Sequence, residues 1–418
     1  MTRTTSLTRR GFLKGTAGLA AAAVAAPVII PSRVFGANER ITIGYIAMGR
    51  RARQLFDLPK DQTQIVAVSD VYKARMDEFV SKPVGKDCKA YQDYRELLAD
   101  KGVDAIITAT PDHWHALVTI HACQAGKDVY VEKPLSLTIA EGRAMVQAAR
   151  KYERIVQVGS QQRSLKECRL GCEIARSGRL GKIHTVHGAN YPSPWECDLG
   201  EQPLPEGLNW DVWCGQTEPR PYHEDLYLPR AKPGWISFRP YSGGEMTGWG
   251  AHGLDIIQWG MGMDNSGPVE VEPEGEGLKC PVTMRYADGT VVHLDGKGPD
   301  GGGLFIGDKG QVTVDRGKCI VEPESLGKDP IGPNEVHLYE SDDHLGNWID
   351  CIRSRKLPAA DVEIGHRSCT MCHLGNIARW TGRKLTWDPA KEQFVNDDNA
   401  NTYIQRAMRA PYQIPEVI

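Results

Sequence analysis

Short apolar runs alternate with helix-like stretches in the first part of the chain, beginning at residue 41. Runs of this length that are rich in β-branched and aromatic residues are typical of buried strands. Strands that alternate with helices over about 120 residues predict a doubly wound parallel sheet. The strand-like runs are 41–46, 64–70, 103–110, 128–131 and 155–159, and the helix-like stretches include 91–101, 116–125 and 139–152.

The pattern changes after residue 160. An amphipathic helix is predicted over 165–177, and the alternation over 183–191 predicts a half-buried strand. Helices are predicted at 344–353 and 365–380, and the last 30 or so residues are predicted to form an extended arm. Between these segments, short strand-like runs separated by glycine-containing turns predict a meander at 283–286, 290–294, 303–307 and 311–314.

Residues 192–240 show little periodicity and are rich in Pro, Trp and Tyr. This composition predicts long loops. Their aromatic side chains either form a surface on which a carbohydrate stacks or anchor the loops in the interior, and the sequence leaves both interpretations open.

The composition is that of a globular protein with more than one domain. The 418 residues are 41% hydrophobic, which is enough for two or three domains with substantial cores. The 50 Lys and Arg residues against 53 Asp and Glu give a net charge of −3. Because nucleic-acid binding needs a basic excess that is missing here, small molecules are the expected ligands and a nucleic-acid partner is not expected.

Residues 1–37 are predicted to be an export signal and not part of the fold. Arg9 and Arg10 precede a Phe-Leu-Lys triplet, and an Ala-rich, weakly apolar run follows over 15–26. This order resembles the twin-arginine export signal, which implies the twin-arginine export machinery as a partner and a periplasmic location; an ordinary secretory signal is the alternative. The apolar run is too short to span a bilayer, so no stable membrane anchor is expected.

The 11 cysteines lack the spacing of a disulfide framework, and an odd number cannot all pair. Cys369, Cys372 and His373 match the C-x-x-C-H pattern of covalent haem attachment. The surrounding residues read as a helix with Leu374 and Ile377 on one side, where an i, i+3 pair of cysteines arises by chance. We therefore favour buried thiols over a haem site.

Residues 47–53 follow the first strand directly and have the length and position of the dinucleotide-binding turn G-x-G-x-x-G. The second glycine is retained as Gly49, where the backbone must approach a pyrophosphate. Alanine replaces the other two, and Ala47 is expected to need a turn with negative φ. The candidate cofactor-binding residues of this turn are Ala47, Met48, Gly49, Arg50 and Arg51.

The second strand ends at Asp70, 21 residues after Gly49. An acidic side chain at this place accepts hydrogen bonds from the adenosine ribose and repels a 2′-phosphate, which favours NAD over NADP. Arg50 and Arg51 would still ease the binding of a 2′-phosphate. A helix N-cap is a second role for Asp70, compatible with the first.

The run 128–131 stops on Glu132, Lys133 and Pro134. A strand of this kind delivers charged groups to its carboxyl end, where open α/β sheets bind their ligands. A cationic amine fixed there can meet both a cofactor and a substrate hydroxyl. The alternative is a surface lysine paired with Glu132 or with nothing.

Motifs that occur in this order resemble those of the Gfo/Idh/MocA family of NAD(P)-dependent sugar and polyol oxidoreductases: A-M-G-R-R-A, S-D, T-P-D-H-W-H, V-E-K-P-L-S, V-G-S-Q-Q-R and G-W-G-A-H-G-L-D. The resemblance runs from about Arg40 to the end of the chain, and with the export signal it is similar to the exported branch of that family. It implies an α/β protein with a doubly wound Rossmann domain (38–160), a C-terminal α/β domain with a large, mostly antiparallel sheet (161–390), and a C-terminal arm (391–418). An active site between the domains and a homo-oligomer are implied as well.

The resemblance also implies roles for single residues. Asp112 and His113 would lie beside the nicotinamide riboside. No metal is expected, because paired His and Asp residues in these motifs contact cofactor or substrate and no further ligands converge in sequence. The implied cofactor contacts are Thr110, Pro111, His113, His115, Glu132, Lys133 and Gln161, and the implied substrate contacts are Arg163, Tyr191, Trp249 and His252.

The candidate catalytic residues are Lys133, His252 and Asp255. His252 and Asp255 stand on the first turns of a predicted helix and share one face. A histidine titrates near neutral pH, so it can take a hydroxyl proton as hydride leaves the same carbon; a packing role is the alternative. Many family members carry an Asp four residues before this His, where Gly248 stands here. Asp255 would either orient His252 or close the helix turn.

The predicted activity is NAD-dependent oxidation of a CH–OH group of a sugar, glycoside or polyol. Outside the cytoplasm there is no replenished NAD pool, so the cofactor is expected to be held tightly and recycled in place. One alternative is an NAD-dependent glycosidase of the α-N-acetylgalactosaminidase kind, which oxidises its substrate transiently and eliminates the aglycone. Another is a non-catalytic sugar-binding module on the same fold.

Overall fold

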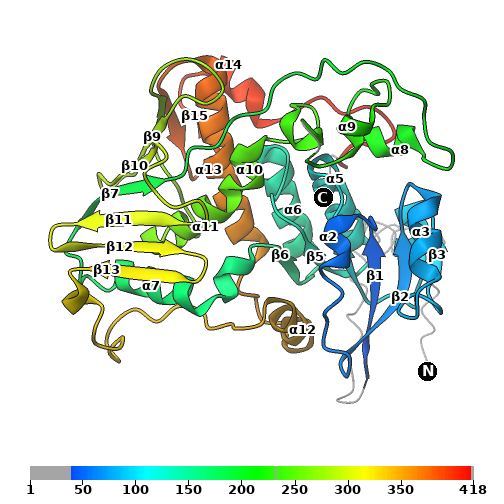
Figure 1. The fold of residues 1–418 in the computed structure, drawn as a ribbon, viewed down its shortest axis with the longest axis horizontal. Helices are drawn as coiled ribbons and strands as arrows, with labels where there is room; N and C mark the ends of the chain where they lie inside the picture. Colours follow the sequence, from blue (N-terminus) through cyan, green and yellow to red (C-terminus); the bar gives the residue numbers. More distant parts are fainter. Residues whose placement is uncertain (1–38, 231–232, 416–418) are drawn as a thin grey trace, which may run out of the picture. The chain divides into compact units, whose positions relative to one another are not determined.

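The computed structural model describes residues 39–230 and 233–415 of the chain (Figure 1). The predicted export signal, residues 1–37, lies outside the described residues. Within the described ranges, no helix is both long and apolar enough to cross a membrane.

A six-stranded parallel sheet forms the first domain. The strands are ordered β3-β2-β1-β4-β5-β6, and every neighbouring pair is parallel. This is the doubly wound order that reverses between β1 and β4, so the predicted Rossmann domain is confirmed. The strands are β1 (Ile41–Ile46), β2 (Thr63–Ser69), β3 (Lys89–Tyr91), β4 (Ala105–Thr108), β5 (Asp128–Val131) and β6 (Val156–Val158).

Helices cover both faces of this sheet because its strands are apolar on both sides. Three pack on one face, namely α4 (Tyr94–Ala99), α5 (Asp112–Gln124) and α6 (Ile139–Lys151), and the short α2 (Arg50–Arg53) and α3 (Lys73–Val80) pack on the other. Helix α5 begins at Asp112, earlier than predicted. Its cap residue is Pro111, which has no N–H to satisfy, and the acid in its first turn suits the helix dipole.

Helix α12 (His344–Ser354) also packs on the first domain, although it comes much later in the chain. Its Trp348 is fully buried, with its ring 5.8 Å from that of Tyr130 in β5. The imidazole of His344 lies 2.9 Å from the Val158 carbonyl oxygen at the end of β6. The bounds predicted for the second domain, 161–390, therefore include a helix that completes the core of the first.

A nine-stranded sheet forms the second domain, in the order β13-β12-β11-β7-β10-β9-β8-β14-β15. Only the β7–β10 pair is parallel, which confirms the predicted, mostly antiparallel sheet. Its strands are β7 (Ile183–Gly188), β8 (Glu270–Pro273), β9 (Val282–Arg285), β10 (Val291–Leu294), β11 (Gly303–Gly307), β12 (Gly310–Asp315), β13 (Lys318–Glu322), β14 (Leu385–Asp388) and β15 (Gln393–Phe394).

Helices α7 (Lys166–Arg176), α11 (Gly250–Met261) and α13 (Val362–Thr381) pack against one face of this sheet (Figure 1). Cys369 and Cys372 of α13 are 2% and 0% exposed, and Cys369 Sγ lies 3.5 Å from the Ser136 carbonyl oxygen. Two thiols enclosed in this way leave no space for a covalently attached haem. All eleven cysteines are unpaired in the structure.

The segment 192–241 is mostly loop, with the short helices α8 (Trp210–Cys214) and α9 (Glu224–Tyr227) and the 3₁₀ turn η2 (Trp235–Ser237). Most of its aromatic side chains are buried together, which favours the anchoring interpretation over an open stacking surface. The buried members are Trp213, Tyr222, Tyr227, Trp235, Phe238 and Tyr241.

The predicted C-terminal arm is only partly extended. Its first residues add β15 to the sheet and form the short α14 (Asp398–Asn401) and η4 (Thr402–Ile404). Farther on, Arg406 Nε donates to Glu141 Oε1 at 2.7 Å, and the Tyr412 ring packs on Trp114 at 5.5 Å. The end of the described chain is thereby fastened to the first domain. The remaining short elements are η1 (Gln161–Ser164), α10 (Glu245–Gly248) and η3 (Glu324–Leu326).

Candidate active site

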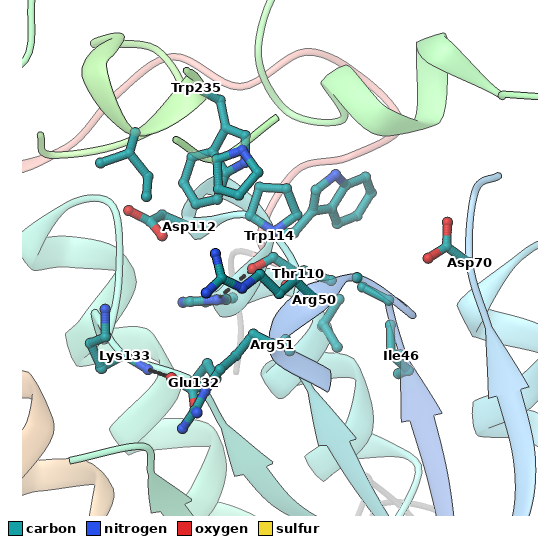
Figure 2. A pocket seen from close by; sticks show the side chains of 18 of the residues that line it. Ile46, Arg50, Arg51, Asp70, Thr110, Asp112, Trp114, Glu132, Lys133 and Trp235 are labelled. Atoms are coloured by element: carbon teal, nitrogen blue, oxygen red, sulfur yellow. Dashed lines mark hydrogen bonds and ion pairs between the residues drawn. The ribbon is translucent and has the colours of Figure 1, made fainter. Parts of the chain in front are cut away.

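A cavity of about 760 Å³ lies at the carboxyl ends of β1, β2, β4 and β5 (Figure 2). This is the side of an open parallel sheet on which ligands bind. Residues of the second domain complete its walls, so the cavity lies between the two domains. Its lining includes Ala47, Gly49, Arg50, Arg51, Asp70, Thr110, Pro111, Asp112, His115, Glu132, Lys133, Gln161, Arg230, Trp235, Trp249, His252 and Arg316.

The turn after β1 departs from expectation at Ala47. Its φ is +68°, in the left-handed region, whereas a negative φ was expected. The Ala47 N–H donates to the Ser69 carbonyl oxygen at 2.8 Å, so the reversal out of the sheet holds this residue in a conformation that glycine adopts more easily. A Cβ added at Gly49 would be in ordinary van der Waals contact with one protein atom, Arg75 Nη1, at 3.7 Å.

Asp70 follows β2 directly and lies at one end of the cavity (Figure 2). Its two carboxylate oxygens accept the N–H groups of Met48 at 2.6 Å and Tyr72 at 2.8 Å. Burial raises the pKa of this carboxyl, and the nearby Arg75 opposes that rise. Asp70 is not the N-cap of α3, a position that Tyr72 holds. The Met48 side chain is buried in the core, so only its main chain faces this end of the site.

Lys133 is partly buried and lines the opposite end of the cavity (Figure 2). Its Nζ donates to the Gly248 carbonyl oxygen at 2.8 Å, which joins the end of β5 to α10. Glu132 is bound instead to Arg51, with Nε to Oε1 at 2.8 Å. The alternative of a surface lysine paired with Glu132 therefore does not describe this residue. Burial lowers the pKa of Lys133, and the carboxylates of Glu132 and Asp112 oppose that change.

His252 stands on the first turns of α11 and also lines the cavity. It is 8% exposed, and its imidazole has no hydrogen-bond partner among the described residues. Burial, and then the positive charge of Lys133, hold the pKa of His252 well below its usual value. The imidazole is therefore neutral near pH 7 and able to accept a proton. The indole of Trp249 lies 5.6 Å from it, and Trp249 is 39% exposed toward the cavity.

The residues after β4 have divided roles. Thr110, Pro111 and Asp112 line the cavity, and the imidazole of His115 lies between two carbonyl oxygens, 2.9 Å from that of Thr110 and 2.8 Å from that of Pro134. His115 thus ties the ends of β4 and β5 together.

His113, expected to contact the cofactor, turns away from the cavity. Its Nε2 lies 2.7 Å from the Trp213 carbonyl oxygen, and burial lowers the pKa of His113 to about 3. Because α5 already begins at Asp112, the side chain of the next residue points into the aromatic cluster of the 192–241 segment.

Three further predicted residues lie outside the lining of the cavity. Asp255 was expected to orient His252, but its carboxylate accepts Arg163 Nε at 2.9 Å and Ser368 Oγ at 2.6 Å. Arg163, expected to contact substrate, is fully buried in that ion pair and in a second one with Asp264. Tyr191 donates its hydroxyl to the Asp300 carbonyl oxygen at 2.9 Å. None of the three lines the cavity, and the pair of Arg163 and Asp255 instead joins α11 to the segment before α7 in a buried contact.

Several lining residues carried no signal in the sequence. Arg230 and Trp235 come from the loop-rich segment, and Arg316 comes from the turn between β12 and β13. The Arg316 guanidinium lies over the Trp249 ring, 5.1 Å from its centre, and its Nε donates to Gln162 Oε1 at 2.8 Å. Lone arginines in loops match no motif, so only the fold brings them to the site. The described residues contain no cluster of three or more His, Cys, Asp or Glu side chains that could hold a metal ion.

Known proteins show similarity over both domains. Residues 41–160 match the family model described as the oxidoreductase family's NAD-binding Rossmann fold, and residues 180–414 match that of its C-terminal alpha/beta domain. An inositol 2-dehydrogenase of Salmonella paratyphi B is 34% identical over 129 residues, which are 31% of this chain and 38% of that protein. A Glycosyl hydrolase family 109 protein 1 of a Shewanella species is 28% identical over 212 residues, 43% of this chain and 44% of that protein. The chain thus spans less than half the length of each of these two relatives.

Among solved structures, the WlbA dehydrogenase of Bordetella pertussis, in complex with NADH and UDP-GlcNAcA, has a TM-score of 0.62 and 18% sequence identity. The similarity covers 84% of this chain and 98% of that one, and at this identity it shows the fold alone. The two family models together span nearly all of the described residues, in the order that the fold requires. The chain therefore belongs to the Gfo/Idh/MocA oxidoreductase family, with its NAD-binding Rossmann fold at residues 41–160.

Proposed function

We propose that this protein is an NAD-dependent oxidoreductase that acts on a CH–OH group of a sugar, glycoside or polyol. The observation that carries the proposal is that Lys133 and Asp70 lie at opposite ends of one cavity (Figure 2), whose lining also includes Gly49 and His252, with His252 close enough to Lys133 to be influenced by its charge. The Asp70 end is suited to binding an adenosine ribose, and the Lys133 end is suited to proton transfer. The cavity between these ends lies between the two domains.

The residues present fit the cofactor. Gly49 lines the cavity and has no side chain to obstruct a group that approaches its main chain, and the Asp70 oxygens keep lone pairs for ribose hydroxyls beyond the two N–H groups that they accept. When bound, NAD supplies the acceptor for a hydride. The carboxylate at Asp70 and the family's NAD-binding fold favour NAD over NADP.

The protein's own residues divide the proton chemistry. His252 is neutral and accepts the hydroxyl proton of the substrate. Lys133 directs an N–H toward the alcohol oxygen and stabilises the negative charge that develops on it. Trp249, which is 39% exposed and lies next to His252 in the lining, offers an apolar surface for a sugar ring.

A second candidate function is redox-neutral cleavage of a glycoside, in which oxidation is followed by elimination and the hydride returns to the same molecule. The similarity to a family 109 glycosyl hydrolase favours it. The same Lys133 and His252 would serve the transient oxidation, so the two functions differ in their net products.

A substrate screen tests these functions. We expect mass spectrometry of the purified protein to detect NAD, and we expect at least one member of a panel of hexoses, N-acetylhexosamines, uronic acids and myo-inositol to reduce it, seen as nicotinamide absorbance. Cleavage of p-nitrophenyl N-acetyl-α-galactosaminide without net NADH would favour the glycosidase. A protein that binds no NAD and shows no thermal shift with NAD would be a sugar-binding module, and the proposal would fail.

We further propose that the protein is exported to the periplasm by the twin-arginine route. The Arg9-Arg10 pair and the following Ala-rich run support this. Export of a folded protein that already holds NAD would remove the need for a periplasmic supply. Replacing both arginines by lysine should leave the protein in the cytoplasm, as measured by cell fractionation; continued export would contradict this route.

A homo-oligomer is the last part of the proposal. On the outer face of the nine-stranded sheet, Ile320 of β13 is 52% exposed and lies in register with Thr313, which pairs in turn with Leu304. Burial of this face against a second copy would remove the apolar surface from water. Light scattering during gel filtration should give a mass above that of one chain, and a monomer would contradict the proposal.

A further inference from the structure

Several charged groups act on the Lys133 amine from different elements. Glu132 and then Asp112 favour its protonated form, Arg230 opposes it, and Glu245 favours it by a smaller amount; His252 is a further titratable group in the lining of the cavity. Each of the three carboxylates has a partner of its own: Glu132 binds Arg51, Asp112 accepts the Ser242 hydroxyl at 2.7 Å, and Glu245 binds Arg230. Glu245 is the carboxylate that stands on the same element as the hydrogen-bond acceptor of Lys133.

Glu245 and Gly248 are the first and last residues of α10. The Glu245 side chain folds back over Gly248, because a Cβ added at Gly248 would lie only 2.9 Å from Glu245 Oε2. The carbonyl of the same glycine accepts Lys133 Nζ at 2.8 Å. A side chain at residue 248 would therefore displace this carboxylate from its place beside the glycine that accepts the lysine.

Arg230 fixes the carboxylate from the other side. Its Nε donates to Glu245 Oε1 at 2.9 Å and its Nη2 donates to Oε2 at 3.1 Å, so both oxygens are held. Arg230 and Lys133 line the cavity, whereas Glu245 does not. Glu245 is thus placed to act on Lys133 and Arg230 and not on a substrate directly.

We propose that Glu245 is a positioning residue for Lys133. Its carboxylate occupies the space that Gly248 leaves open, keeps the amine protonated and holds it toward the Gly248 carbonyl. The sequence led us to expect that Gly248, which replaces an Asp of other family members, leaves the site without an acidic partner. In this arrangement the missing side chain of Gly248 leaves space for the carboxylate of Glu245. The inference rests on the proposed role of Lys133, but its main test needs neither NAD nor a substrate.

The test is the reactivity of Lys133 toward acetic anhydride, which attacks the neutral amine. Loss of the negative charge in Glu245→Gln should raise the rate of Lys133 acetylation at neutral pH about threefold or more, measured by peptide mass spectrometry. Gly248→Ala should raise it similarly by displacing the carboxylate. Glu340→Gln, which removes a charge at a 71% exposed site in an ion pair with Arg169, is the matched control and should leave the rate unchanged.

Restoring a carboxylate by a second substitution distinguishes the effect of its charge on Lys133 from a general disturbance of the structure. The double variant Glu245→Ala with Gly248→Asp returns a carboxylate to the same space, and it should bring the acetylation rate to within about twofold of the wild-type value. A wild-type rate in Glu245→Gln would overturn the inference. So would a double variant that melts like the wild type but keeps the raised rate. If the double variant does not fold, the single variant decides.

Turnover distinguishes this inference from the proposed function. With a sugar or inositol that reduces bound NAD, Glu245→Gln should lower kcat about tenfold and change KM little, because the residue acts through Lys133 and not on the substrate. A changed KM with an unchanged kcat would instead make Glu245 a substrate-binding residue and overturn the inference. If the wild type oxidises nothing, the proposed function fails, and the acetylation result still decides the role of Glu245.

Discussion

The two ends of the cavity are built in different ways. At the Asp70 end, main-chain groups do the holding: the carboxylate accepts two N–H groups, and the Ala47 N–H donates to the Ser69 carbonyl. At the Lys133 end, the groups come from β5, α10, α11 and the loop that carries Arg230. The first end follows from the order of strands in a parallel sheet, whereas the second depends on the packing of segments that lie far apart in sequence.

The two ends of the cavity also differ in the charges that surround their titratable groups. The Asp70 carboxylate is set among N–H groups, with Arg75 as the nearest counter-charge acting on it. His252 instead lies among cations and stays neutral, because burial and the charges of Lys133 and Arg316 lower its pKa. The first end is suited to binding and the second to moving a proton. Variants at each end should therefore separate affinity from turnover.

The largest expected effect is that of Lys133→Ala. Loss of the amine that we propose to polarise the alcohol oxygen should reduce kcat about a thousandfold on a sugar or inositol that reduces bound NAD. The affinity for NAD, measured by calorimetry, should change less than about threefold, since the adenosine end is intact. Lys297→Ala, at a 72% exposed site, is the control for loss of a lysine. Turnover that survives within about tenfold would contradict the role of Lys133.

His252→Ala should reduce kcat about a hundredfold by removing the proposed proton acceptor. The dependence of wild-type activity on pH should also show that a neutral His252 is needed. A base works when it is unprotonated, so activity is present above its pKa and is lost as the pH falls below it. An ordinary histidine is half protonated at about pH 6.5. Because the pKa of His252 lies well below 6.5, activity should persist at that pH and in more acid solution. An acid limb centred at the usual histidine pKa would contradict this assignment.

At the other end, Asp70→Ala should weaken NAD binding about thirtyfold, because hydrogen bonds to a charged group contribute about 2 kcal/mol. At saturating NAD the kcat should stay within about threefold of the wild type. Calorimetric titration with NAD measures the first quantity and initial rates measure the second. A drop in kcat without a loss of affinity would mean that the two ends are not functionally separate.

The same contrast explains which parts of the molecule the sequence could predict. The alternation of strands and helices and the placement of Asp70 and Lys133 at strand ends are local patterns, and the structure has them at the predicted positions. The placement of α12 on the first domain depends on contacts between residues such as Trp348 and Tyr130, more than 200 positions apart. A local hydrophobic pattern cannot predict a contact between residues so far apart in the sequence.

Asp255 shows the same limit within the site. Both residues stand on α11 as predicted, but only His252 lines the cavity, and the Asp255 carboxylate is bound by the buried Arg163. Arg230 and Glu245 are likewise brought to Lys133 only by the fold. Helix and strand periods predict which side chains share a face, whereas a partner from another segment decides what a polar group on that face does.

The smallest expected effect concerns Ala47, where the main chain of the cofactor end is under strain. A non-glycine residue in the left-handed region costs about 1–2 kcal/mol, and the extra freedom of glycine in the unfolded chain offsets about half of that. Ala47→Gly should therefore stabilise the protein by about 0.5–1 kcal/mol and raise its Tm by about 1–3 °C. Ala52→Gly is the matched control, because Ala52 lies within α2 and has no positive φ. That substitution should destabilise by about 1 kcal/mol. If both variants lowered Tm equally, Ala47 would not be strained, and the turn would fit alanine as well as glycine.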